Sequence, residues 1–253
     1  MIGVGTSLLF DRRAGKAGPP IPPFNKAMVD AWFMSGLSNA DKPGSITGVM
    51  GNEMALKNFA FTSESGFGEG SYEGALVFDG VDDYGICNNL PILTDYTVIC
   101  RRVIESGDDT CVASKSNAIG SGAFIYEIFQ SYYKAFSFGA QQEVTVDKSD
   151  NVTYQTKTNY NGQSINAGTS TDSDKLFIGR IRETYEGYIL KGAIYYFALY
   201  NKSLTPEEIE TEKERLNEEW LKRSKVTIPE PDVYYDLSLK DNSSPTRNII
   251  DDL

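Results

Sequence analysis

The chain has 253 residues, a formal net charge of −11 and no histidine. The acidic balance opposes sequence-independent binding to nucleic acid or to an anionic membrane surface, since both need clustered Lys and Arg to displace counterions. The absence of histidine excludes Ser-His-Asp and Cys-His nucleophilic catalysis and removes the commonest metal ligand. The charge balance therefore favours a solvated, repulsive surface.

Export and membrane signals are absent from the printed sequence. The first ten residues have no basic stretch, and glycines interrupt their apolar run, so they make a poor signal peptide. No stretch approaches the roughly 20 apolar residues of a membrane span. Cys87, Cys100 and Cys111 form no CxxC pair, so we expect buried thiols and folding in a cytoplasm.

Residues 1–26 are predicted to form an extended arm. A small basic cluster, Arg12, Arg13 and Lys16, precedes the sequence Gly-Pro-Pro-Ile-Pro-Pro-Phe at 18–24. Its prolines favour polyproline II and oppose a helix or a central strand. One interpretation is a disordered tail. We expect instead an arm that docks on a neighbouring subunit, with Arg12, Arg13 and Phe24 as contact residues.

Residues 27–203 show the pattern of a β-rich domain. The most informative segment is 74–84, Gly-Ala-Leu-Val-Phe-Asp-Gly-Val-Asp-Asp-Tyr, where a short apolar run meets the strong turn pair Asp79-Gly80. Asn161-Gly162 predicts a two-residue hairpin turn. The other predicted strands are 29–33, 54–61, 95–103, 110–113, 123–129, 133–138, 151–160, 163–166, 175–179 and 192–200.

These strands, roughly ten in number and without alternating helices, predict an all-β, two-sheet antiparallel sandwich. In the strand at 95–103, Val98, Cys100 and Arg102 should point to one face and Thr97, Ile99 and Arg101 to the other. The segments 37–51 and 66–74 are predicted to be loops because they are rich in glycine and polar turn residues.

Several segments occur in an order and spacing that resembles a known family. They are 74–84, 95–98, 160–162, 176–180 and 191–209. Together they resemble the laminin-G-like jelly rolls of the concanavalin A-like lectin and glucanase superfamily. The resemblance implies a jelly-roll sandwich, and modules of this kind without signal peptides occur in structural proteins of tailed bacteriophages. The chain departs from the family pattern at Cys100-Arg101-Arg102 and at Tyr195.

Residues 204–224 are predicted to form an amphipathic helix. Thr205 is a suitable N-cap and Glu208 stands three residues later, as in a capping box. Three apolar residues share one face, Ile209, Leu216 and Trp220. This face is expected to lie on the sandwich or on a partner, and Trp220 is the residue predicted to contact a partner.

Residues 225–253 resemble the beginning of the sandwich. At one constant offset Asp232 aligns with Asp30, and Tyr234 and Tyr235 align with the Trp32-Phe33 pair. Chance similarity is one interpretation. The others are a linker followed by the start of a second module, or a strand exchanged with a neighbouring subunit. Under the last interpretation Tyr234 and Tyr235 contact the partner.

No catalytic residues are predicted. Sandwich-fold glucanases of the superfamily carry alternating acidic residues on a strand, whereas the comparable residues here, 207–214, lie on the predicted helix as a solvated face. Asp79, Asp82 and Asp83 have the chemistry to bind Ca²⁺. We favour the alternative that these aspartates form turns by bonding their own backbone, and so expect no cofactor.

Tyr132 and Tyr133, with Tyr126 and Tyr154, are candidates for a platform on which a sugar stacks. The alternative is that these tyrosines belong to the core or to cross-strand pairs.

Two functions follow from these observations. The first hypothesis is a non-enzymatic virion structural protein, of the head-fibre, decoration or tail-appendage type, assembled in a host cytoplasm. Its partners would be virion or self subunits, held through the arm and the C-terminal segment. The alternative is a carbohydrate-binding or adhesion module of a bacterial surface protein. An enzyme comes third.

Overall fold

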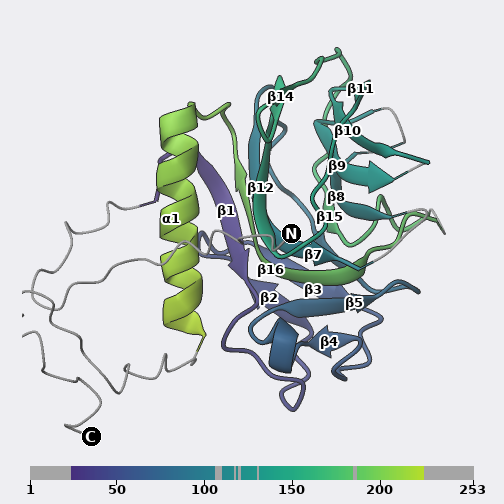
Figure 1. Ribbon diagram of the computed structural model, residues 1–253, viewed down its shortest axis with the longest axis vertical. Helices are drawn as coiled ribbons and strands as arrows, with labels where there is room; N and C mark the ends of the chain where they lie inside the picture. Colours follow the sequence, from purple (N-terminus) through teal and green to yellow (C-terminus); the bar gives the residue numbers. More distant parts are fainter. Residues whose placement is uncertain are drawn as a thin grey trace, which may run out of the picture.

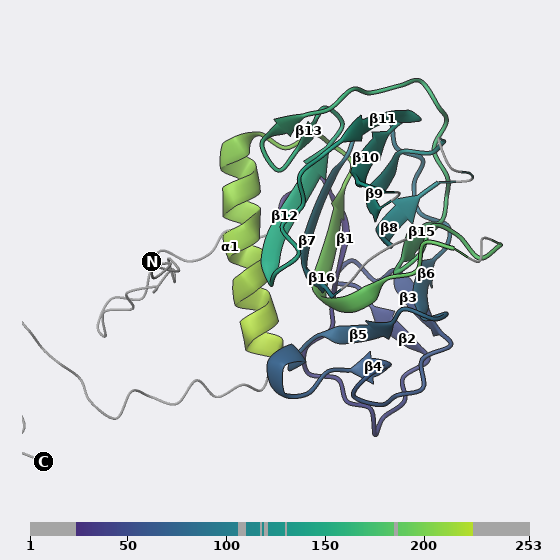
Figure 2. The same ribbon diagram turned by 45° about the vertical axis from the view of Figure 1, so that its right-hand side comes forward.

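The computed structural model describes residues 24–105, 110–116, 118, 121–129, 131–184 and 187–224. Two antiparallel sheets face each other, and one helix lies along the outer face of one sheet (Figures 1 and 2). The predicted all-β sandwich with a C-terminal helix is confirmed. Most of the predicted arm and all of the C-terminal tail, including Arg12, Arg13, Tyr234 and Tyr235, lie outside the described residues.

Sheet 1 is the sheet covered by the helix. Its strands in spatial order are β14 (Gln163–Ser164), β13 (Asn159–Tyr160), β12 (Asn151–Thr156), β7 (Thr97–Ile104), β16 (Lys191–Tyr200), β5 (Leu76–Asp79) and β4 (Gly66–Phe67), and β1 (Met28–Phe33) also pairs with β16.

Sheet 2 forms the other layer of the sandwich. Its strands in spatial order are β11 (Ala140–Glu143), β10 (Tyr133–Ser137), β9 (Phe124–Phe129), β8 (Cys111–Lys115), β15 (Leu176–Ile178), β6 (Tyr84–Cys87), β3 (Glu53–Lys57) and β2 (Ser45–Thr47). All pairs in both sheets are antiparallel.

The structure corrects the loop predictions at 37–51 and 66–74. The first contains β2, and the second contains β4 and a short 3₁₀ helix, Gly70–Tyr72. β4 was missed because its outer edge is completed by a side chain rather than by a strand. The Asn39 amide donates to the Phe67 carbonyl at 2.8 Å and accepts from the Phe67 N–H at 2.6 Å, which covers an otherwise open sheet edge.

The hairpin prediction at 151–166 is confirmed at its turn but not along its whole length. Asn161 and Gly162 have φ angles of 45° and 87° and join β13 to β14, as the primed hairpin turns require. The long strand expected at 151–160 is divided into β12 and β13, because residues 157 and 158 leave the ladder. Similarly, the strand expected at 54–61 ends at Lys57.

The alternation predicted for β7 is confirmed and divides the apolar side chains into two clusters. Val98 and Cys100 belong to the core between the sheets, whereas Ile99 and Val103 belong to a second cluster beneath the helix. Sheet 1 is therefore apolar on both faces, which explains why β16 is a nearly continuous hydrophobic run.

The three cysteines are free and buried, as predicted. Burial raises the pKa of the Cys87 thiol to about 11, so this thiol stays protonated at neutral pH. A protonated, buried thiol behaves as a small apolar side chain.

The helix α1 (Pro206–Arg223) begins with the predicted capping box. The Thr205 hydroxyl accepts from the Glu208 N–H at 3.2 Å, and the Glu208 carboxylate accepts from the Thr205 N–H at 2.9 Å. None of the helices in the described part of the chain combines the length and apolar character needed to span a membrane.

Trp220 anchors the last turns of α1 to sheet 1. Its indole N–H donates to the Gly74 carbonyl at 2.8 Å, and its ring meets Tyr195 edge-on at 5.6 Å. Gly74 has a φ of +76°, and a Cβ there would lie 2.8 Å from the Trp220 ring, so a glycine fits this position. The prediction that Trp220 contacts a partner is wrong, because the side chain is buried against its own sandwich.

Candidate functional site

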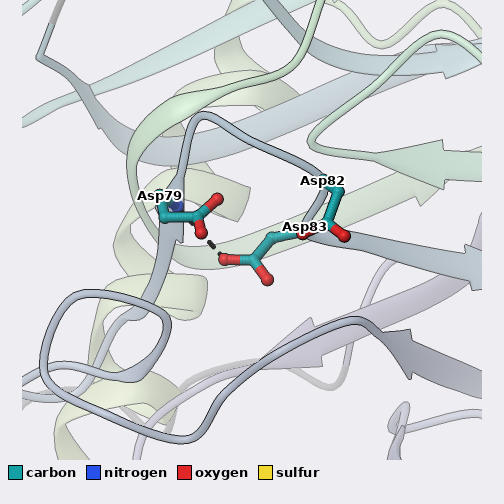
Figure 3. A group of neighbouring side chains, drawn as sticks. All are labelled: Asp79, Asp82 and Asp83. Atoms are coloured by element: carbon teal, nitrogen blue, oxygen red, sulfur yellow. Dashed lines mark hydrogen bonds between the residues drawn. The ribbon is translucent and has the colours of Figure 1, made fainter. Parts of the chain in front are cut away.

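The acidic turn after β5 brings Asp79, Asp82 and Asp83 together (Figure 3). One oxygen from each carboxylate lies within 4.8 Å of the others. Asp83 has no exposed surface, and its two oxygens are both occupied: one accepts from the Asp79 N–H at 3.1 Å and the other from the Ser65 hydroxyl at 3.0 Å. Asp79 likewise accepts from the Val81 N–H at 2.7 Å.

Burial and hydrogen bonding have opposite effects on the pKa of Asp83. Burial raises the pKa of Asp83 to about 6, against the opposing effect of its two hydrogen bonds. The carboxylate oxygens of Asp79 and Asp83 thus hold the turn between β5 and β6 in place. The geometry favours the turn-forming interpretation over a calcium site.

The predicted tyrosine platform is divided by the fold. Tyr132 has 44% of its surface exposed on the turn between β9 and β10, and Tyr133 beside it is half-buried. Tyr126 is completely buried, with its hydroxyl bonded to Thr153. The prediction that Tyr126 contacts a glycan is therefore wrong. Tyr154 faces α1, where the Lys213 ammonium lies 4.9 Å from its ring centre.

The residues left at the surface form an aromatic turn, defined here as Phe129, Tyr132, Tyr133 and Lys134. The Lys134 ammonium lies 4.8 Å from the centre of the Tyr132 ring. Tyr133 packs edge-on against Phe129 at 5.0 Å. The Tyr133 hydroxyl is covered and has no hydrogen-bond partner among the described residues. This turn presents aromatic rings and polar atoms at one place on the surface.

Beneath the aromatic turn lies a buried polar cluster centred on Glu127. Its carboxylate accepts two hydrogen bonds from the Arg102 guanidinium, each 2.6 Å long. The hydroxyls of Tyr160 and Thr153 donate to it at 2.6 Å and 3.0 Å. Arg102, Thr153 and Tyr160 belong to sheet 1, whereas Glu127 belongs to sheet 2, so the cluster ties the two layers together.

A β-bulge in β9 places Glu127 in the interior. Lys134 pairs with Ile128 and Phe136 pairs with Ile125, so two residues of β9 oppose one residue of β10. Glu127 has a φ of +53°, an uncommon angle for a residue with a side chain. Because of the bulge, both Tyr126 and Glu127 are fully buried in the sandwich.

The charge of Glu127 also affects the pKa of Tyr133 in the aromatic turn. Burial, followed by the charge of Glu127, raises the pKa of Tyr133. The same causes raise the pKa of Tyr160. Both tyrosines therefore keep their hydroxyl protons at neutral pH.

The sequence interpretation missed Glu127 and the role of Arg102. Two signals were present: Glu127 is the only charged residue in β9, Phe-Ile-Tyr-Glu-Ile-Phe, and Arg102 departs from the family pattern at a position predicted to face inward. A lone acid in an apolar strand and an inward arginine together indicate a buried ion pair, since a buried charge needs a partner.

A separate pocket of about 450 Å³ lies beside the C-terminal end of α1. Its walls include Leu37 and the carboxylate-bearing Asp41, Glu69 and Glu73. It offers acceptors but no cationic side chain, and its one aromatic residue, Phe67, is buried. We therefore regard the aromatic turn as the stronger candidate site.

No protein-family profile matches the sequence, and no curated protein matches it. Solved structures are similar in fold. The binding domain of botulinum neurotoxin serotype D has a TM-score of 0.50 and 11% identity, over 75% of this chain and 52% of that chain. A mutant Trypanosoma rangeli sialidase displaying trans-sialidase activity has a TM-score of 0.45 and 12% identity, over 81% and 35%.

A structure of the serotype D ligand-binding domain in complex with N-acetylneuraminic acid has a TM-score of 0.42 and 11% identity, over 75% of this chain and 51% of that chain. This chain thus spans about half the length of the neurotoxin chains. At 11% identity, the similarity to the structure with a TM-score of 0.50 shows a shared β-sandwich fold and nothing more.

Proposed function

We propose that this chain is a non-catalytic recognition module that binds a glycan through the aromatic turn. The observation that carries the proposal is the exposed ring of Tyr132 beside Tyr133 on the β9–β10 turn. Aromatic rings with a few placed polar groups are the usual lining of ligand sites. Here the polar groups are the hydroxyl of the exposed Tyr132 and the Lys134 ammonium.

The Glu127 cluster supports this assignment from below. Ligand-binding side chains need a rigid base. If they are mobile before binding, the entropy lost when the ligand orders them lowers the affinity. Glu127 accepts four hydrogen bonds and joins the two sheets next to the turn. Its carboxylate has no exposed surface, which argues against a role as an acid or base on a substrate.

The fold similarity supports a binding role without identifying the ligand. The neurotoxin structure with a TM-score of 0.50 is described as a binding domain. Fold alone does not determine function, so the proposal depends on the aromatic turn.

The proposal is tested by glycan-array binding of the full chain, followed by affinity measurement with the best glycan. Tyr132→Ala removes the exposed ring, and we expect affinity to fall about tenfold, the equivalent of one stacking contact. Tyr154→Ala is the matched control, since Tyr154 lies beneath α1, and it should bind as the unmodified chain does. Unchanged affinity in Tyr132→Ala, or an array without binding, would contradict the proposal.

We also propose a location for this module. The resemblance to laminin-G-like jelly rolls favours a virion, as a head fibre, decoration protein or tail appendage assembled in a host cytoplasm. The alternative is an adhesion module on a bacterial cell surface. Co-sedimentation of the chain with intact particles would support the first, and recovery in the cell envelope alone would support the second.

Partner contacts through the two ends remain predictions. Of the residues predicted to make them, Phe24 is described and lies half-buried beside α1, and Trp220 is excluded by its burial. Sedimentation velocity of the full chain tests whether the subunits associate.

A further inference from the structure

A groove of about 490 Å³ runs between the first described residues and α1. Phe24, Asn25 and Lys26 form one wall, and residues of α1 between Glu207 and Arg215 form the other. This groove is far from the aromatic turn in the sequence and belongs to the opposite layer of the fold, where the helix lies (Figure 2).

One donor in the wall of this groove lacks an acceptor. Arg215 is only 6% exposed and pairs with the buried Glu212 through one terminal nitrogen. Its guanidinium carbon lies 5.7 Å from the centre of the Phe24 ring. Its Nε has no hydrogen-bond partner among residues 24–224 that the structure describes. A buried N–H of this kind calls for an acceptor, because leaving it unpaired is unfavourable.

The face of α1 beside the groove carries carboxylates that form no ion pair with any described residue. Four glutamates of the helix are paired, Glu208 with Lys202, Glu210 with Lys213, Glu212 with Arg215 and Glu219 with Arg223.

The remaining three, Glu207, Glu214 and Glu218, have no ion-pair partner in the described part of the chain. Their spacing of seven and four residues places them on one face of the helix. Glu207 and Glu214 are exposed. This face, which we call the acidic face, would attract a basic segment.

We propose that residues 12–23 of the same chain dock on this groove and on the acidic face. They immediately precede Phe24, which is itself part of the groove, and they carry Arg12, Arg13 and Lys16. The proline-rich stretch at 18–23 favours polyproline II, whose carbonyls make no internal hydrogen bonds. These carbonyls are acceptors for donors along the groove wall, and the basic side chains pair with the carboxylates of the acidic face.

The dimensions allow this arrangement. At about 3.1 Å per residue, the eight residues from Phe24 back to Lys16 extend about 25 Å. The 18 residues of α1 extend about 27 Å at 1.5 Å each. A segment tethered at the groove also has a millimolar effective concentration there. The chain's own arm therefore outcompetes the arm of a second copy, in contrast to the sequence expectation that it grips a neighbour.

Zero-length carbodiimide crosslinking of the full chain tests the proposal. Lys16 is the only lysine in residues 1–23, so its crosslinks report the position of the arm. We expect Lys16 to link to Glu207, Glu214 or Glu218, with a yield that is independent of protein concentration over a hundredfold range. Refolding a mixture of ¹⁴N and ¹⁵N chains should give links within chains only.

Two variants make the test specific. Arg12→Ser with Arg13→Ser removes basic groups that take no part in the coupling chemistry, and we expect at least a fivefold lower yield of Lys16 crosslinks. Glu64→Gln, at an exposed loop position, is the matched control and should leave the yield unchanged. Links between ¹⁴N and ¹⁵N chains, links of Lys16 to other elements, or no links would each overturn the proposal.

Discussion

Arg101 and Arg102 are neighbours on β7 but lie in two different regions of the molecule. Arg102 points into the interior between the sheets, where it is completely buried and paired with Glu127. Arg101 points to the helix-covered face, where its guanidinium lies 4.4 Å from the Tyr195 ring and 4.5 Å from the Trp220 ring. It also forms a two-bond pair with the exposed Asp150.

The difference shows that the contribution of an arginine to stability depends on its surroundings. In the interior, a charge without its partner is strongly unfavourable, so each member of the pair depends on the other. On the helix-covered face, water reaches Asp150, and the arginine contributes by packing as much as by charge. We therefore expect substitutions in the interior to cost more than substitutions beneath the helix.

Of the substitutions considered, Arg102→Ala should lower the free energy of unfolding most. It leaves Glu127 buried with its charge unpaired, and we expect a loss of about 4 kcal/mol in the free energy of unfolding. Urea denaturation at pH 7 measures this loss. The double variant Arg102→Met with Glu127→Gln removes both charges but keeps an oxygen that accepts from the Tyr160 and Thr153 hydroxyls, so it should recover part of the lost stability. A loss below about 1 kcal/mol in the single variant would show that the interior tolerates an unpaired charge.

The two arginines also show what the sequence can and cannot predict. The alternation of β7 was correct for both side chains, because a strand has a period of two residues. The partner of Arg102 was missed, because the inward position of Glu127 depends on a bulge with a positive φ that a Glu side chain does not favour. Strand alternation alone does not indicate a bulge.

For the helix α1 too, the sequence predicts the local structure but not the surface that the helix covers. Its capping box and its apolar stripe follow from local sequence, and both were predicted correctly. The stripe does not say which surface it covers, so Trp220 was assigned to a partner. Its actual place depends on Gly74, whose missing side chain makes room for the indole ring.

Trp220→Ala should have the largest effect on the helix-covered face. It removes a buried ring and its hydrogen bond to the Gly74 carbonyl, and we expect a loss of about 3 kcal/mol. Leu221→Ala is the matched control, because Leu221 is 40% exposed, and its effect should stay within about 0.5 kcal/mol. Equal losses in the two variants would mean that the helix contributes little to the folded state.

Asp83 extends the comparison to a buried carboxylate that has no ion-pair partner among the described residues. Its pKa is raised to about 6, so between about pH 4 and pH 6 the folded chain holds a proton that the unfolded chain releases. This contribution therefore weakens the fold as the pH rises through that window. Asp83→Asn should remove an effect of about 1 to 2 kcal/mol.

Urea denaturation between pH 4 and pH 7 measures that slope. The difference in unfolding free energy between the unmodified chain and Asp83→Asn should change across the window and become constant above it. Identical slopes for the two proteins would contradict the assignment of the titration to Asp83.

Arg101→Ala should have the smallest effect, about 1 kcal/mol, because it combines a solvent-exposed ion pair with two cation–π contacts of modest strength. The loss should be local. Amide hydrogen exchange should become faster in the last turns of α1, where Trp220 loses the guanidinium beside its ring, while exchange in β9 stays unchanged. Arg101→Lys keeps the charge but not the planar group, so it should fall between alanine and arginine. Faster exchange in β9 would instead mean that the two faces of β7 are coupled through the strand.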